Sequence, residues 1–227
     1  MELGFANQLR YADEISSFRG ALVEHIGREN DAFHNHDNSD SNSGFLYRYP
    51  LIQYVPIRRR KAWYPVVRCA GTAATEFHKL FGATDWTIRL NDRREALQLE
   101  SVQPHEHRLS YLRKPKVYQL QDYIALNQTN FKKFQQCTGL VQQIQFLERM
   151  ISGHVLALAS GMEWSIPERF NTTILSCDSP TPINYKRRNL LSFNLRFQTE
   201  IDLPVGLGLG KGASLGYGRI HHPGSHN

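Results

Sequence analysis

The chain has 227 residues, which is enough for one large domain or for two small domains of roughly 100 residues each. Its formal net charge is +6, and ten histidines add positive charge as the pH falls, so an anionic partner is favoured. No stretch approaches the ~20 apolar residues of a membrane span, and the N-terminus lacks a signal-peptide pattern, so we expect a soluble cytoplasmic protein with no membrane partner. Three cysteines, odd in number and far apart, argue against a disulfide framework and against a cysteine metal centre: Cys69, Cys137 and Cys177.

The first part of the chain alternates predicted strands and helices. Residues 2–10 are predicted to form a strand, and apolar residues at helical spacing predict a helix over 13–26. Residues 35–44 are rich in Asn, Asp, Ser and Gly, which predicts a loop. His34 and His36 should therefore lie where the helix gives way to this loop.

A hairpin, a helix and a strand are predicted next. Residues 46–57 and 61–69 are aromatic and β-branched runs that flank three arginines at 58–60, which is typical of a hairpin with a cationic tip. A second helix is predicted over 73–81 and a further strand over 86–90. The order strand, helix, strand, strand, helix, strand is that of a ferredoxin-like βαββαβ fold.

The second part of the chain is predicted to hold a degenerate copy of the same fold. A strand-rich region around 95–120 is followed by apolar residues on one helical face, which predict a long helix over 139–159. Apolar and polar residues alternate over 191–198, as in a half-buried strand. We therefore predict an α+β protein of two ferredoxin-like domains, residues 1–100 and 101–227.

Several histidines and tyrosines have a plain structural interpretation. His154 lies on the apolar stripe of the long predicted helix, where a hydrogen-bonded core histidine is expected, and His25 is interpreted as an ordinary helix histidine. Tyr49 and Tyr54 could stack on bases, but aromatic residues in strands more often belong to the core. None of these four residues is taken as catalytic.

Residues 206–218 carry six glycines and Lys211. Glycines allow positive φ and close approach to a ligand, and clustered backbone amides can bind an anion, so Gly208, Gly210, Lys211 and Gly212 are candidate phosphate contacts. A P-loop is rejected because Gly212 stands where Ser or Thr must follow the lysine, and a dinucleotide fold is rejected because too little chain follows. A flexible hairpin loop is the alternative interpretation.

The residues His34 and His36 suit the cleavage of RNA by its own 2′-hydroxyl. That reaction needs a base near the 2′-hydroxyl and an acid near the leaving 5′-oxygen, and histidine can serve in either role because its unperturbed pKa is ~6.5. Residues i and i+2 project to the same side of an extended loop, which allows both histidines to act together. Tyr47 could orient a phosphate or donate a proton.

Cationic side chains could neutralise RNA phosphates, although such runs are also common on solvated surfaces. The candidates are Arg48, Arg58, Arg59, Arg60, Lys61, Lys186, Arg187 and Arg188. The pair His34 and His36 could also suggest a metal nuclease, but no further ligands with matching spacing accompany it, and His105 and His107 form a second such pair with no better support. We therefore predict no metal and no cofactor.

The block Phe33-His-Asn-His-Asp-Asn, with Tyr47-Arg-Tyr-Pro-Leu-Ile-Gln-Tyr54, Lys61-Ala62 and Gly71, resembles the N-terminal signature of the CRISPR-associated repeat-processing endoribonucleases of the RAMP superfamily, in particular their subgroup with a histidine-rich loop. The glycine-rich segment at 206–218 is similar to the phosphate-facing loop of that family. The chain departs from the family in the hairpin, where Val55 and the three arginines replace a common lysine and glycine.

This resemblance implies two ferredoxin-like domains that bind CRISPR repeat RNA and cleave it without a metal, leaving a 5′-hydroxyl and a 2′,3′-cyclic phosphate. It implies a catalytic role for His36 or His34 and places Tyr47 near the site. Two other hypotheses are a non-catalytic RNA-binding subunit of a CRISPR effector complex and a metal-dependent nuclease. Association with other effector subunits and a homodimer are both compatible with the resemblance.

Overall fold

The computed structural model describes residues 1–26, 49–76, 81 and 85–224. The chain divides into two compact units, Met1–Glu106 and His107–Asn227, whereas the sequence suggested a boundary after residue 100. Each unit combines an antiparallel sheet with helices, so the predicted fold class, α+β with two ferredoxin-like halves, is confirmed. Among the described helices, none combines the length and apolar character that crossing a membrane requires.

The sheet of the N-terminal unit has the strand order β2-β3-β1-β6, and neighbouring strands are antiparallel. Its strands are β1 (Glu2–Phe5), β2 (Ile52–Arg59), β3 (Ala62–Cys69) and β6 (Leu99–Gln103). Counted in chain order within the unit, this is the 4-1-3-2 arrangement of a βαββαβ fold. The helical segments are the 3₁₀ turn η1 (Ala12–Glu14), α1 (Ile15–Ile26) and α2 (Ala73–Glu76).

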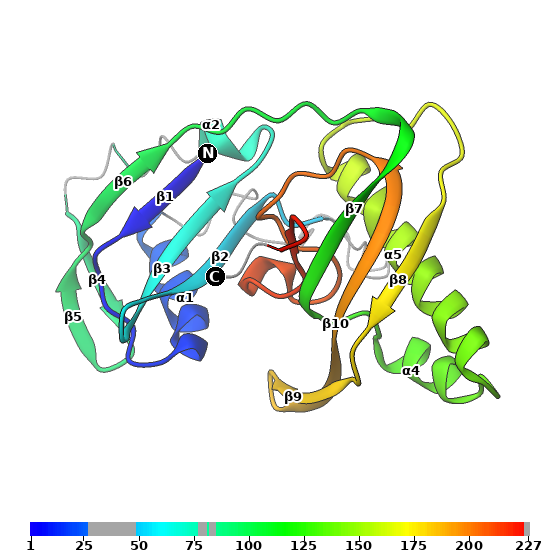
Figure 1. The fold of residues 1–227 in the computed structure, drawn as a ribbon. Coiled ribbons are helices and arrows are strands. Elements are labelled where there is room, and N and C mark those ends of the chain that lie inside the picture. Colours follow the sequence, from blue (N-terminus) through cyan, green and yellow to red (C-terminus); the bar gives the residue numbers. More distant parts are fainter. Residues whose placement is uncertain (27–48, 77–80, 82–84, 225–227) are drawn as a thin grey trace, which may run out of the picture. The chain divides into compact units, whose positions relative to one another are not determined.

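Helix α1 packs against one face of this sheet (Figure 1). Phe18 of α1 and Phe5 of β1 are fully buried, and their rings meet edge to face with centroids 5.3 Å apart. Aromatic pairs in this geometry stabilise a core beyond the burial of their area alone. The helix therefore uses the apolar stripe that its sequence pattern predicts.

The predicted strand over 86–90 exists, but it does not close the sheet. It becomes β4 (Thr87–Leu90), which pairs with β5 (Arg93–Ala96) in a separate two-stranded sheet. The fourth strand of the fold is β6 instead. Its residues are partly or fully exposed and mostly polar, so it lacks the apolar alternation by which a strand is recognised in sequence.

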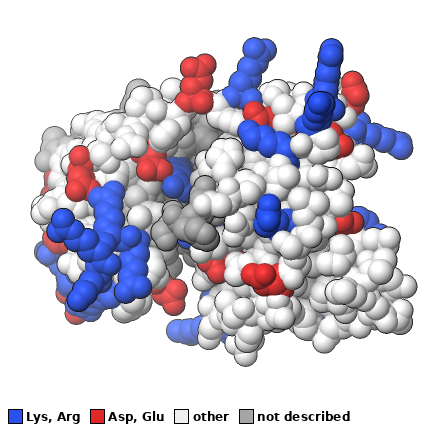
Figure 2. Space-filling model, in the orientation of Figure 1, with Lys and Arg blue, Asp and Glu red and all other residues white. Residues whose placement is uncertain are grey.

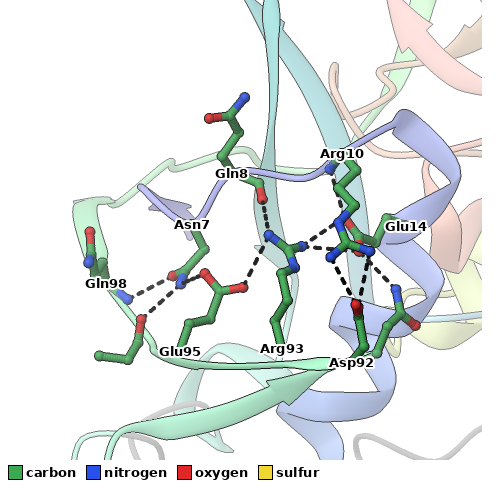
Figure 3. Close-up of polar contacts among 10 residues, drawn as sticks. Asn7, Gln8, Arg10, Glu14, Asp92, Arg93, Glu95 and Gln98 are labelled. Carbon is green, nitrogen blue, oxygen red and sulfur yellow. Dashed lines mark hydrogen bonds and ion pairs between the residues drawn. The ribbon is translucent and has the colours of Figure 1, made fainter.

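A polar network attaches the β4–β5 hairpin to the chain that leaves β1 (Figure 3). The buried carboxylate of Glu14 accepts hydrogen bonds from Arg10 N at 2.7 Å, Asn91 Nδ2 at 2.8 Å and Arg93 Nη2 at 3.1 Å. The side chain of Asn7 donates to Ala96 O at 2.8 Å. A buried charge is costly unless it is paired and hydrogen-bonded, and these donors meet that requirement.

The C-terminal unit repeats the 4-1-3-2 order as β11-β7-β10-β8, with β9 paired to the first part of β10. Its strands are β7 (Tyr111–Tyr123), β8 (Thr172–Cys177), β9 (Thr181–Tyr185), β10 (Arg188–Ile201) and β11 (Arg219–His221). Helices α4 (Gln128–Gln135) and α5 (Leu140–Gly161) connect β7 to β8. Between β10 and β11, where a βαββαβ fold has its second helix, the glycine-rich segment holds only the short 3₁₀ turn η2 (Ala213–Leu215).

The secondary-structure predictions have mixed outcomes. The long helix over 139–159 is confirmed as α5, and the alternating strand is confirmed as part of β10. The predicted strand over 2–10 ends at Phe5, and α4 was not predicted, because its polar residues bury no side chain completely. The predicted loop over 35–44 lies outside the described residues.

Candidate nucleic-acid interface

The glycine-rich segment is held firmly within the C-terminal unit. Lys211 N donates to Ile124 O at 3.1 Å, Gly218 N donates to Asp122 O at 3.1 Å, and Leu209 N donates to Gly218 O at 2.8 Å. Four of its apolar side chains are buried: Leu207, Leu209, Ala213 and Leu215. The segment is therefore a packed turn rather than a flexible hairpin loop.

These hydrogen bonds limit how many backbone amides of the segment can bind an anion. Besides the amides just named, those of Leu215 and Tyr217 donate to Gly212 O, at 2.8 and 3.3 Å. A backbone N–H that already donates to a carbonyl of its own unit has little capacity left for a phosphate. These amides are therefore already paired within the unit, and a phosphate contact of Gly208, Gly210, Lys211 or Gly212 stays a prediction.

Close packing against aromatic rings explains two of the glycines. A Cβ on Gly210, which has φ 79°, would lie 2.7 Å from Cε2 of Tyr123. A Cβ on Gly212, also at φ 79°, would lie 3.0 Å from Cε2 of Tyr185 and from Cδ2 of Tyr217. Both positions require a residue without a side chain. Their glycines are thus accounted for by the fold, with or without a ligand.

The turn between β9 and β10 brings cations to this segment. Tyr185 pairs with Arg188 across the hairpin, and the rings of Tyr185 and Tyr217 meet edge to face at 5.5 Å. Lys211 is partly buried, which lowers its pKa, and the positive charges of Arg188 and Lys186 lower it further. Two groups of predicted RNA contacts that are far apart in the sequence are therefore neighbours in the structure.

The β9–β10 turn is also strained. Its two central residues, Lys186 and Arg187, have φ values of 49° and 62°. A two-residue hairpin turn with positive φ at both positions strongly favours Asn-Gly or similar pairs, because a side chain crowds the backbone there. Backbone strain of this kind is concentrated at functional sites. The turn keeps two cations where Asn and Gly would be more stable.

A second cationic surface lies at the β2–β3 turn of the N-terminal unit. Figure 2 shows Lys and Arg side chains gathering over the part of this unit where Figure 1 places that turn. Arg58 lies over the ring of Trp63 at 5.8 Å, and Arg59 lies over Tyr64 at 5.8 Å and pairs with Glu100. All four predicted cations of the tip are exposed: Arg58, Arg59, Arg60 and Lys61.

The predicted catalytic residues His34, His36 and Tyr47 lie outside the described residues, and so does the predicted RNA contact Arg48. Within the described ranges, no group of three or more His, Cys, Asp or Glu side chains is arranged to hold a metal ion. His105 and His107 are exposed, and His107 Nε2 lies 3.0 Å from Asp202 O.

The interpretation of His154, Tyr49 and Tyr54 as core residues is confirmed. His154 Nδ1 and the hydroxyl of Tyr123 share a hydrogen bond of 2.7 Å, and burial lowers the pKa of His154 to about 4. Tyr54 is buried in the N-terminal core, and Tyr49 is buried and accepts a hydrogen bond from Gln53. The residues that sequence reasoning missed are Tyr185 and Tyr217, whose packing against each other and around Gly212 depends on tertiary structure.

Comparison with known proteins agrees with this architecture. The family model of the Cas6b N-terminal domain matches residues 1–108, and that of the Cas6b C-terminal domain matches residues 110–223. A solved structure of Cas6b is similar in fold, with a TM-score of 0.76 and 21% identity over 97% of this chain and 99% of the other. A solved CRISPR RNA processing endoribonuclease Cas6b has a TM-score of 0.62 and 19% identity over 97% of this chain and 98% of the other.

In sequence, the chain is 22% identical over 98 residues to an uncharacterized protein of Methanocaldococcus jannaschii. That match covers 43% of this chain and 65% of the relative. The two family models, by contrast, together extend from residue 1 to residue 223 and divide close to the boundary between the two compact units. On this basis the chain belongs to the Cas6b family.

Proposed function

We propose that the protein is an endoribonuclease that cleaves CRISPR repeat transcripts without a metal and thereby matures guide RNA. The observation that carries this proposal is the match of both halves to the Cas6b family, in which one solved relative is described as a CRISPR RNA processing endoribonuclease. The structure adds the strained cationic turn at Lys186 and Arg187 beside Lys211. Cations held at a cost in backbone strain fit a polyanionic substrate.

The proposed reaction uses the 2′-hydroxyl of the RNA as nucleophile. One histidine removes the proton of this hydroxyl while its oxygen forms a bond to the adjacent phosphorus, and the bond from phosphorus to the 5′-oxygen breaks. The other histidine gives a proton to that 5′-oxygen, so the products are a 2′,3′-cyclic phosphate and a 5′-hydroxyl. His34 and His36 share these two roles, and Tyr47 orients the phosphate.

The remaining predicted contacts hold the RNA backbone. Lys186, Arg187, Arg188 and Lys211 neutralise phosphates at the C-terminal unit, and the packing of Gly208, Gly210 and Gly212 positions Lys211 for this task. The cations of the β2–β3 turn and Arg48 contribute in the N-terminal unit. Because these contacts are ionic, affinity should fall steeply as salt rises.

The proposal is tested by incubating the protein with CRISPR repeat RNA from the same genome in the presence of EDTA. A matched RNA carries one 2′-deoxynucleotide at the cut position. Cleavage of the first RNA but not of the second supports attack by the 2′-hydroxyl without a metal. Loss of cleavage in EDTA would instead indicate a metal nuclease, and tight binding without cleavage would indicate an RNA-holding subunit.

The histidine assignment is tested by His34→Ala and His36→Ala. Removing a general acid or base should slow cleavage by ~10²–10⁴ while leaving RNA affinity nearly unchanged. His105→Ala is the matched control, because His105 belongs to an exposed pair of the same spacing and should cleave normally. A double variant of His34 and His36 that cleaves at the normal rate would rule out the assignment.

A further inference from the structure

Glu163 has a backbone conformation that the proposed RNA binding of the protein does not explain. Among the described non-glycine residues with positive φ, Asn91 and Asp122 are of types that tolerate it. Arg60 and the 186–187 turn carry cations that the proposed function uses. Glu163, at φ 55°, is acidic and lies at the end of helix α5.

Two features make this position unfavourable for a glutamate. Glu163 N donates to Ser160 O at 3.0 Å and Trp164 N donates to Ala159 O at 2.9 Å, which is the hydrogen-bond pattern of a Schellman cap. The residue in the left-handed position of that cap is usually glycine. A carboxylate at a helix C-terminus also faces the negative end of the helix dipole. The side chain is therefore kept at a cost in stability.

Glu163 lines an open cavity of about 410 Å³ at the surface of the unit. Its walls include apolar and aromatic side chains, among them Leu156, which is 52% exposed although it is large and apolar. The other lining residues are Ala159, Ser160, Trp164, Ser165 and Ile166.

The charge of the cavity selects its ligand. Glu163 and the negative end of α5 repel phosphate, so the backbone of an RNA does not suit this site, although the protein as a whole is basic. A guanidinium can stack on an indole and form paired hydrogen bonds with a carboxylate, while its methylene stem packs on apolar walls. Lysine has no planar group to stack in this way.

We propose that the cavity at the end of α5 binds an arginine side chain presented by a protein partner. Trp164 supplies the stacking surface, Glu163 supplies the counter-charge, and Leu156 and Ile166 contact the methylene stem. None of the lining residues is among the RNA contacts proposed above.

The test follows the indole NMR signals of the full-length protein labelled with [¹⁵N]tryptophan, with Trp164→Phe identifying the signal of Trp164. N-acetyl-arginine amide is added at millimolar concentrations, and N-acetyl-citrulline amide, its neutral isostere, is the control. We expect a saturable shift of the Trp164 signal with the arginine compound alone, and an affinity at least ~5-fold weaker in Glu163→Gln. Equal shifts with both compounds, an unchanged affinity in Glu163→Gln, or no shift would overturn the proposal.

A second variant tests the premise about stability. Glu163→Gly relieves the backbone strain and the unfavourable dipole interaction, so Tm should rise by a few degrees while the response to arginine disappears. A Tm that stays the same or falls would remove the reason for regarding Glu163 as retained for binding. A saturable shift with guanosine in place of arginine would show that the cavity binds a nucleobase and would also overturn the proposal.

Discussion

At the scale of single residues, Tyr123 links the glycine-rich segment to helix α5. Its ring is contacted closely by Gly210, and its hydroxyl shares a hydrogen bond with His154, whose ring meets it edge to face at 5.7 Å. Gly210 and His154, which both contact Tyr123, are therefore constrained for different reasons. Gly210 is constrained by space and backbone conformation, and His154 is constrained by its buried, uncharged state.

Replacing Gly210 by alanine should lower the free energy of unfolding by about 1–3 kcal/mol, because the new Cβ meets the Tyr123 ring and Ile124 O and the backbone stays at positive φ. Urea denaturation measures the change. Gly153→Ala is the control: Gly153 lies in α5, where a new Cβ would have no neighbouring atom within 4 Å, so alanine should stabilise by about 0.5–1 kcal/mol. Equal effects of the two variants would contradict this explanation of the glycine.

The stability of the protein should also depend on pH through His154. Burial lowers the pKa of His154 to about 4, whereas an unfolded histidine titrates near 6.5. Between these values the unfolded chain binds more protons, so stability is full above about pH 6.5 and falls toward pH 4, by up to about 3 kcal/mol. Urea denaturation across this range should show a smaller loss for His154→Gln, and an identical loss would contradict the assignment.

At the scale of elements, short turns carry the cations that the proposed function needs. The β9–β10 turn places Lys186 and Arg187 at positive φ, and the β2–β3 turn does the same for Arg60 at φ 57°. In both turns the neighbouring strands fix the direction in which the turn leaves the sheet. The strain is tolerated because the paired strands determine the turn, whatever residues occupy it.

Replacing Lys186-Arg187 by Asn-Gly should separate stability from RNA binding. The preferred turn residues should raise the free energy of unfolding by about 1 kcal/mol. The loss of two phosphate contacts should weaken RNA binding and reduce the slope of log K against log salt by about 1.4. Urea denaturation and binding titrations at several salt concentrations measure the two effects.

The control for this variant is Lys132→Gln with Lys133→Gln, which removes the same charge from exposed positions on α4. It should leave the salt dependence nearly unchanged. If both double variants reduce the slope equally, the effect comes from net charge, and the β9–β10 turn is no specific contact.

At the scale of the whole molecule, the two units have the same strand order in their sheets but differ in the segment that precedes the last strand. Both sheets have the 4-1-3-2 order, but the second unit replaces the last helix by the glycine-rich segment. A helix at that position would cover the sheet with side chains. The packed turn instead lies against the β9–β10 hairpin, and this contact is what brings Lys211 near Lys186 and Arg188.

The amino-acid sequence by itself determined the elements with strong periodicity. Helix α5 and strand β10 could be predicted because burial on one side imposes a spacing of 3.6 or 2 residues on the apolar positions. The order of strands and helices was enough to predict the ferredoxin-like halves, and the two histidines near residue 35 remain a prediction about catalysis. These inferences depend only on local pattern or on resemblance.

Only the tertiary structure decided which strand closes the first sheet and what the glycines do. Strand β6 has little apolar alternation, so its pairing with β1 is visible only in the folded unit. The glycines at 210 and 212 suggested a phosphate site, but their neighbours are the rings of Tyr123, Tyr185 and Tyr217. Contacts between residues distant in sequence leave no local pattern, because the space that each one fills is defined by the other.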